Sequence, residues 1–203
     1  YRNSEVATPY SVGADSRLQI PGNLYIVGTM NTADKSIASI DYAIRRRFLF
    51  FPVLPDIKVV YETVKDDWKE ATELKLFIFI EKMFDSYMNT DDYNRNDVQI
   101  GHTYFLRKDT DAAAADQMKN RFLYQVVPVL REYYNDGILM ADVYGREPSD
   151  YENDCILDIK KMIAESDMDR LEAMYETLVG KLSNSDIIDG IKAALLEKKV
   201  LAE

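Results

Sequence analysis

The 203-residue sequence contains one cysteine and one histidine, Cys155 and His102. A single cysteine cannot form an internal disulfide, and a single histidine leaves no cluster for a zinc site. We therefore expect neither a disulfide framework nor a metal centre in this chain. This cysteine usage is typical of proteins in a reducing cytoplasm, which is where we place the protein.

Long apolar runs are also lacking. The longest, such as residues 48–54 and 76–80, are far shorter than the roughly 18 residues that a membrane helix needs. The chain opens on Tyr1 without an initiator methionine or a signal peptide, so we expect a fragment of a longer polypeptide with no membrane contact. Its 25 basic and 35 acidic residues also exclude a general electrostatic attraction to nucleic acid.

Two motifs of nucleotide hydrolysis are missing. The phosphate-binding loop has the form G-x-x-x-x-G-K-[ST], and no Gly-Lys step in this chain has the first glycine of that motif. The chain also contains no Asp-Glu dipeptide, the acidic pair that would close an apolar strand and hold Mg²⁺. A complete P-loop site is therefore excluded. The 47% hydrophobic content still predicts a folded chain with one domain or two small ones.

The first 55 residues have the pattern of strands and turns. Residues 24–27 are apolar on both faces, as a central strand of a covered sheet would be, and residues 48–53 form a second such run before Pro55. Residues 17–20 predict a short strand, and residues 21–23 a turn. The isoleucines between the two apolar runs predict a short helix over residues 36–47.

After residue 56 the periodicity is helical. Three stripes at helical spacing predict three buried helix faces, with a kink in the third at Pro128. The stripes are Ile57, Val60, Tyr61, Val64 and Trp68; Phe77, Ile80, Phe84 and Tyr87; and Met118, Phe122, Val126 and Leu130.

Shorter signals complete the map of the helical part. Residues 97–105 predict an extended or turn-like insert, and residues 145–154 have the composition of a linker. Two further helices are predicted over residues 168–182 and 187–201, with Ser166 and Ser185 as caps. We divide the chain into residues 1–55, a helical part at 56–144 and a helical extension at 145–203.

A polar loop and an arginine run flank the predicted short helix. Asn31 and Asp34 follow the first apolar run, and in open α/β sheets ligands bind at that end of a strand. Both residues are also common in turns and helix caps, because their side chains bond nearby backbone N–H groups. Arg46 and Arg47 belong to a run of three arginines, which a helix C-terminus alone would favour electrostatically.

The string NLYIVGTMNTADKSIASIDYAIRRRFLF at residues 23–50 closely resembles the second half of the AAA+ module of McrB, the nucleotide-hydrolysing subunit of McrBC systems that cut modified DNA. The strings QIGHTYF and LYQVVPVLREYY are similar to the lid of that family. The resemblance implies an α/β P-loop NTPase fragment: short strands of the sheet's second half, then a mainly α-helical lid and C-terminal helices. It implies GTP or ATP with Mg²⁺ as cofactor in the full-length protein.

The resemblance also implies roles for single residues. Asn31 matches a sensor asparagine that hydrogen-bonds the γ-phosphate and orients the attacking water. Asp34 and Lys35 match the signature loop near the next subunit; where this chain has Lys35, the family usually has arginine, whose planar fork lysine lacks. Arg46 and Arg47 match positions that supply an arginine finger to a neighbouring subunit, so hydrolysis would depend on a ring.

Three functions stay open at this point. The first is the motor subunit of a restriction system, with DNA bound by another domain and cleavage by a nuclease partner of McrC type. The second is a MoxR or dynein-like AAA+ ATPase that remodels proteins. The third is a helical protein-interaction module without chemistry. His102 lies in the IGHTYF string, where a hydrogen-bonded packing role is favoured over catalysis.

Overall fold

The structure is a computed structural model that describes residues 4–12, 15–30, 46–108 and 113–201. The chain divides into two units, Tyr1–Ser39 and Ile40–Glu203. In the first unit, β1 (Glu5–Val12) pairs antiparallel with β2 (Asp15–Gln19), and the register shifts between Ala7 and Val12, where Pro9 has no N–H to donate. The strand β2 and the turn closed by the hydrogen bond from Leu24 N to Pro21 O confirm two of the predictions.

The two apolar runs that predicted central strands form neither strand nor helix. Residues 24–30 and 48–54 are irregular and exposed: Val27 and Leu49 have 91% and 86% of their surface accessible. The prediction of two covered strands is thus wrong for this structure. A strand needs hydrogen-bonding neighbours, and among the described strands β1 and β2 pair only with each other. The predicted helix at 36–47 lies almost wholly outside the described residues.

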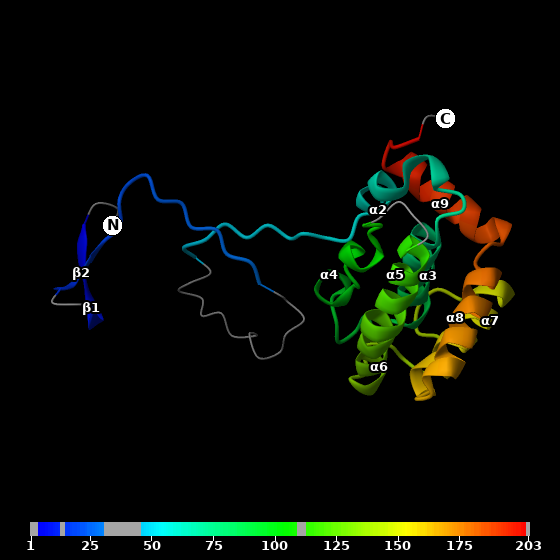
Figure 1. Ribbon diagram of the computed structural model, residues 1–203. Helices are drawn as coiled ribbons and strands as arrows, with labels where there is room; N and C mark the ends of the chain where they lie inside the picture. The colour runs from blue at the N-terminus through cyan, green and yellow to red at the C-terminus, as the bar shows by residue number, and fades with distance from the viewer. Residues whose placement is uncertain (1–3, 13–14, 31–45, 109–112, 202–203) are drawn as a thin grey trace. The chain divides into compact units, whose positions relative to one another are not determined.

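In the second unit, residues 56–201 form a set of helices around one core and are here called the helical unit (Figure 1). The helix α2 (Ile57–Val64) begins at the cap Asp56, and α3 (Thr72–Tyr87) is buried on nearly all sides. In α2, Ile57, Val60 and Val64 are buried, and all four residues of the second predicted stripe are buried in α3. The second predicted face is confirmed, and the first is confirmed for three of its five residues: Tyr61 is half-buried, and the half-buried Trp68 lies beyond the end of α2.

The third stripe spans two helices joined by a wider turn. The helix α5 (Ala113–Arg121) continues through the π-helical segment Phe122–Val126 into α6 (Val127–Asn135). Pro128 lacks an N–H, and its ring clashes with the carbonyl four residues earlier in a regular helix. The expected interruption therefore takes the form of a π-helical turn just before the proline. The insert before α5 contains the short helix α4 (Arg95–Val98) and a 3₁₀ helix, His102–Phe105.

Three helices follow near the C-terminus. The predictions near residues 168 and 187 are confirmed as α8 (Met168–Lys181) and α9 (Ser185–Glu197), but the caps are Asp167 and Asn184 in place of the predicted serines. The segment predicted as a linker instead contains the start of α7 (Asp150–Ala164). Ser149 and Glu152 form a reciprocal capping box there, which stabilises the helix start in spite of the polar composition.

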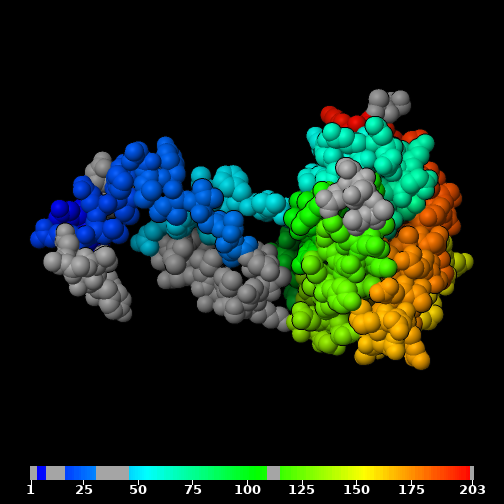
Figure 2. Space-filling model, viewed as in Figure 1, coloured from blue at the N-terminus to red at the C-terminus, as the bar shows by residue number. Residues whose placement is uncertain are grey.

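The core of the helical unit contains residues from α2 to α9. Phe79, Phe122, Ile159 and Leu178 have no accessible surface, and Phe122 packs on Tyr175 across a 5.7 Å centroid distance. In Figure 2 the atoms of α8 lie beside those of the α5–α6 region, where α8 contacts the π-helical segment Phe122–Val126. Helices from both parts of the predicted division at residue 144 therefore share one core, while the functional boundary there stays a prediction. No described helix is long and apolar enough to cross a membrane.

Candidate functional site

Two of the five predicted site residues lie in the described part of the chain. Asn31, Asp34 and Lys35 lie outside the described residues. Arg46 and Arg47 are described, and both lie exposed in a turn just before the irregular apolar run. Their side chains are therefore accessible to solvent. The geometry that can be described in detail is that of the helical unit.

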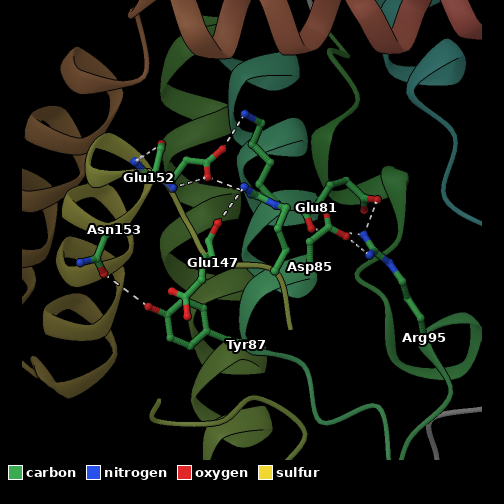
Figure 3. A network of polar contacts seen from close by, with 10 residues as sticks. Glu81, Asp85, Tyr87, Arg95, Glu147, Glu152 and Asn153 are labelled. Carbon is green, nitrogen blue, oxygen red and sulfur yellow. Dashed lines mark hydrogen bonds and ion pairs between the residues drawn. The ribbon is translucent and has the colours of Figure 1, made fainter. Parts of the chain in front are cut away.

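The carboxylate of Glu152 is the centre of a polar network between α3 and α7 (Figure 3). Its oxygens accept hydrogen bonds from Lys82 Nζ at 2.7 Å and from Arg146 Nη2 at 2.8 Å, and the Ser149 N–H donates to it at 3.0 Å. Burial alone opposes ionisation, but these three donors outweigh it and hold the pKa of Glu152 at about 2. The charged carboxylate therefore fixes the start of α7 against α3.

The backbone of the loop before α7 also binds the end of α3. The N–H groups of Tyr144 and Gly145 donate to Ser86 O, and that of Arg146 donates to Asp85 O at 2.9 Å, so they satisfy carbonyls at the end of α3. A Cβ added at Gly145 would lie 2.3 Å from Asp85 O. Glycine is therefore required for this close approach. No sequence pattern pointed to this contact.

Arg95 connects α4 to α3. Its guanidinium pairs with Asp85 and, at 3.0 Å, with Glu81 Oε2 (Figure 3). Burial raises the pKa of Glu81, although Gln99 and Arg95 act in the opposite direction through hydrogen bonds and charge. Desolvation disfavours the charged guanidinium, but the two carboxylates outweigh it and raise the pKa of Arg95. This ion pair fixes the insert between α3 and α5.

Arg107 fixes the end of the same insert. It contacts the buried Glu73 in a bidentate pair, with Nε–Oε1 at 2.9 Å and Nη2–Oε2 at 3.0 Å. Its backbone N–H donates to Thr63 Oγ1 at 3.1 Å. The hydrogen bonds that Arg107 donates to Glu73 raise the pKa of Arg107. Planar guanidinium groups suit such paired geometry, so the loop is held in one orientation on α2 and α3.

His102 makes a structural contact. Its Nδ1 accepts a hydrogen bond from the backbone N–H of Asp56 at 3.2 Å, and the ring is half-buried. The favoured interpretation of His102 as a hydrogen-bonded packing residue is confirmed by this bond. Arg121 Nη1 reaches the same segment and donates to Leu106 O at 2.6 Å.

The described residues of the helical unit include no group of three or more His, Cys, Asp or Glu that could hold a metal ion. One shallow pocket of about 240 Å³ is lined by Tyr134, Ala141, Lys160 and Ile163. Lys160 Nζ donates to Ala141 O there, and burial lowers its pKa. The described charged groups mainly join helices to one another, which is the design of a rigid scaffold.

Comparisons with known proteins assign a class to this scaffold. Residues 88–142 match the family model described as McrB, alpha-helical lid domain. The match begins at the end of α3, includes α4, α5 and α6, and ends before α7. This part of the helical unit is therefore similar to the alpha-helical lid domain of McrB.

The second comparison extends beyond the lid. The chain is 29% identical over 151 residues to the Type IV methyl-directed restriction enzyme EcoKMcrB subunit of Escherichia coli (strain K12). The alignment covers 66% of this chain and 30% of the relative's length. With the lid match, this identity makes the chain McrB-like. No solved structure matches the chain significantly.

Proposed function

We propose that the chain is the C-terminal part of an AAA+ nucleoside-triphosphatase of McrB type, the motor subunit of a restriction system that cuts modified DNA. The observation that carries this proposal is the lid match at residues 88–142. The similarity to a methyl-directed restriction enzyme subunit supports restriction over protein remodelling of the MoxR or dynein kind. A helical interaction module without chemistry would not account for the MNTAD loop and the arginine run.

The helical unit acts as the lid over a nucleotide in this proposal. GTP or ATP with Mg²⁺ is held by a P-loop and an acidic strand, which belong to the longer protein. The exposed apolar residues at 24–27 and 48–54 are then covered by the remaining strands of that α/β core, which accounts for 80% exposure of Tyr25 and 79% exposure of Phe51 in this chain.

Two half-sites carry the chemistry. Asn31 orients the attacking water at the subunit's own nucleotide, with Asp34 and Lys35 beside it at the subunit interface. Arg46 and Arg47 reach the γ-phosphate of a neighbour, where an arginine finger contributes roughly a thousandfold or more in rate. Their exposure in the described turn is compatible with this role. Hydrolysis therefore requires a ring, which acts with a nuclease of McrC type and with a separate DNA-binding domain.

The test uses the longer protein with both arginines changed to alanine. Turnover of GTP or ATP should fall by roughly a thousandfold or more, while nucleotide affinity stays within about twofold, because the finger contacts a neighbour's transition state and not the subunit's own nucleotide. Arg17→Ala, in the hairpin, is the matched control and should leave turnover unchanged. Unchanged turnover in the double variant would remove the finger assignment.

A further inference from the structure

His102 joins two parts of the helical unit that are 46 residues apart in sequence. The imidazole lies at the start of the 3₁₀ helix His102–Phe105, and its Nδ1 accepts the Asp56 N–H at 3.2 Å. Asp56 is the N-cap of α2, and its own side chain accepts the N–H of Lys58 at 3.0 Å. The first residue of the helical fold is thus held by its own side chain on one side and by His102 on the other.

The backbone that carries His102 is itself firmly fixed. Phe105, one turn later, has no accessible surface and packs edge-to-face on Phe77 of α3 at a 5.6 Å centroid distance. Arg121 Nη1 of α5 donates to Tyr104 O at 3.3 Å and to Leu106 O at 2.6 Å. Contacts from two helices therefore prevent the segment from shifting, so His102 presents a fixed acceptor to Asp56.

The chain on the other side of Asp56 leads to the arginines. Residues 48–55 connect Arg47 to Asp56 and include Pro52 and Pro55. Proline fixes its own φ and restricts the residue before it to extended conformations, so residues 51, 52, 54 and 55 have few backbone conformations. The direction in which the chain leaves Asp56 therefore influences where this segment carries Arg46 and Arg47.

We propose that His102 is a positioning residue for those two arginines: by holding the Asp56 N–H, it fixes the direction in which the arginine-bearing segment leaves the lid. This inference rests on the proposed function, because only that function gives Arg46 and Arg47 a role in hydrolysis. The hydrogen bond between His102 and Asp56 does not depend on it. In an assembled ring, the bond couples the direction of the arginine-bearing segment to the helical unit of the same subunit. Loss of the bond misplaces Arg46 and Arg47 relative to the neighbour's γ-phosphate. It leaves the nucleotide contacts of the same subunit unchanged.

Two variants of His102 test whether its Nδ1 acceptor holds the Asp56 N–H. In His102→Asn the side-chain oxygen stands the same number of bonds from the backbone as Nδ1, whereas His102→Leu has a similar shape and no acceptor. We expect the Asp56 amide of the 203-residue chain to exchange hydrogen about tenfold faster in His102→Leu, and near the wild-type rate in His102→Asn. The Arg107 amide, bonded to Thr63, is the internal control. Equal Asp56 exchange in all three proteins would overturn the contact.

The positioning role is tested in the longer protein. His102→Leu should lower the turnover number by about tenfold or more with nucleotide affinity within about twofold of wild type, and His102→Asn should restore most of the turnover. If His102→Leu accelerates Asp56 exchange but leaves turnover unchanged while Arg46→Ala/Arg47→Ala abolishes it, the positioning role is wrong and the proposed function stands. If the arginine variant itself retains full turnover, the proposed function fails independently of His102.

Discussion

Two apolar stretches of the chain differ in their exposure to solvent. Residues 48–54 contain four exposed large side chains in their first four positions, and Leu49 is 86% accessible, whereas Leu74 in α3 has no accessible surface. Both stretches are apolar enough to be buried. The difference is that a helix satisfies its own backbone and needs only a face to pack on, while a strand needs hydrogen-bonding neighbours. The helical unit supplies such faces, and the described strands pair only with each other.

The largest expected effect is a difference in the free energy of unfolding between two Phe→Ala variants. Phe79→Ala should lower the free energy of unfolding of the 203-residue chain by about 3–5 kcal/mol, because Phe79 has no accessible surface and its loss leaves a cavity. Phe51→Ala should change it by less than about 0.5 kcal/mol, because Phe51 is 79% exposed. Urea denaturation followed by circular dichroism measures both. Equal losses would mean that residues 48–54 are covered within this chain.

The carboxylate of Glu152 should contribute to stability with a defined dependence on pH. Glu152→Gln should cost roughly 3 kcal/mol near neutral pH, because Lys82 and Arg146 lose a buried charged partner. The folded-state pKa of about 2 lies below the usual 4.5, so this contribution is complete above about pH 4.5 and disappears as the pH falls towards 2.

Urea denaturation of Glu152→Gln at several pH values measures this dependence. The exposed Glu147→Gln is the charge-matched control and should show a loss under about 0.5 kcal/mol. A gap between wild type and Glu152→Gln that stays constant from pH 6 to pH 2.5 would contradict the assignment of an ionised, buried carboxylate.

Two glycine substitutions compare the packed helical unit with an exposed segment of the chain. Gly145→Ala should destabilise the chain by about 2 kcal/mol, because the new methyl group would meet Asp85 O at 2.3 Å and force α7 away from α3. Gly28→Ala places its methyl group in open space and should be neutral. Thermal unfolding of both variants measures the difference. A neutral Gly145→Ala would show that the backbone contact with α3 is not tight.

The smallest effect compares two serines that precede helices. Ser149→Ala should cost about 1 kcal/mol, because it removes the side-chain oxygen that caps Glu152 N at 3.2 Å. Ser166→Ala should change stability by less than about 0.5 kcal/mol, since Asp167 caps α8. Denaturant titration of the two variants distinguishes them. A larger loss at Ser166 would restore the sequence-based choice of cap.

Periodicity in the sequence predicts most of the helical unit. The stripes of α2, α3 and the α5–α6 pair are buried as expected, because helix formation depends on side chains three and four residues apart. The start of α7 was missed because residues 145–154 have a linker composition, although S-D-Y-E at 149–152 already contains the capping box.

The ion pairs that join the helices could not be predicted from periodicity. Lys82 and Glu152 are 70 residues apart, and Arg107 and Glu73 are 34 apart. Only the folded core brings such residues together, and neither pair has a local spacing signal. The predictions of strands at residues 24–27 and 48–53 were wrong for a related reason: strand pairing depends on residues far away in the sequence. The chemistry assigned to Asn31, Asp34 and Lys35 stays a prediction, since these residues lie outside the described part of the chain.

We infer that this chain contains the lid and two half-sites of a nucleotide-hydrolysing protein whose phosphate-binding loop lies in another part of the polypeptide. Isothermal titration of the purified 203-residue chain with GTP and with ATP, each with Mg²⁺, tests it most directly. We predict no binding in the micromolar range, and micromolar binding by the longer protein that includes the loop. Micromolar affinity of the 203-residue chain for either nucleotide would contradict the claim.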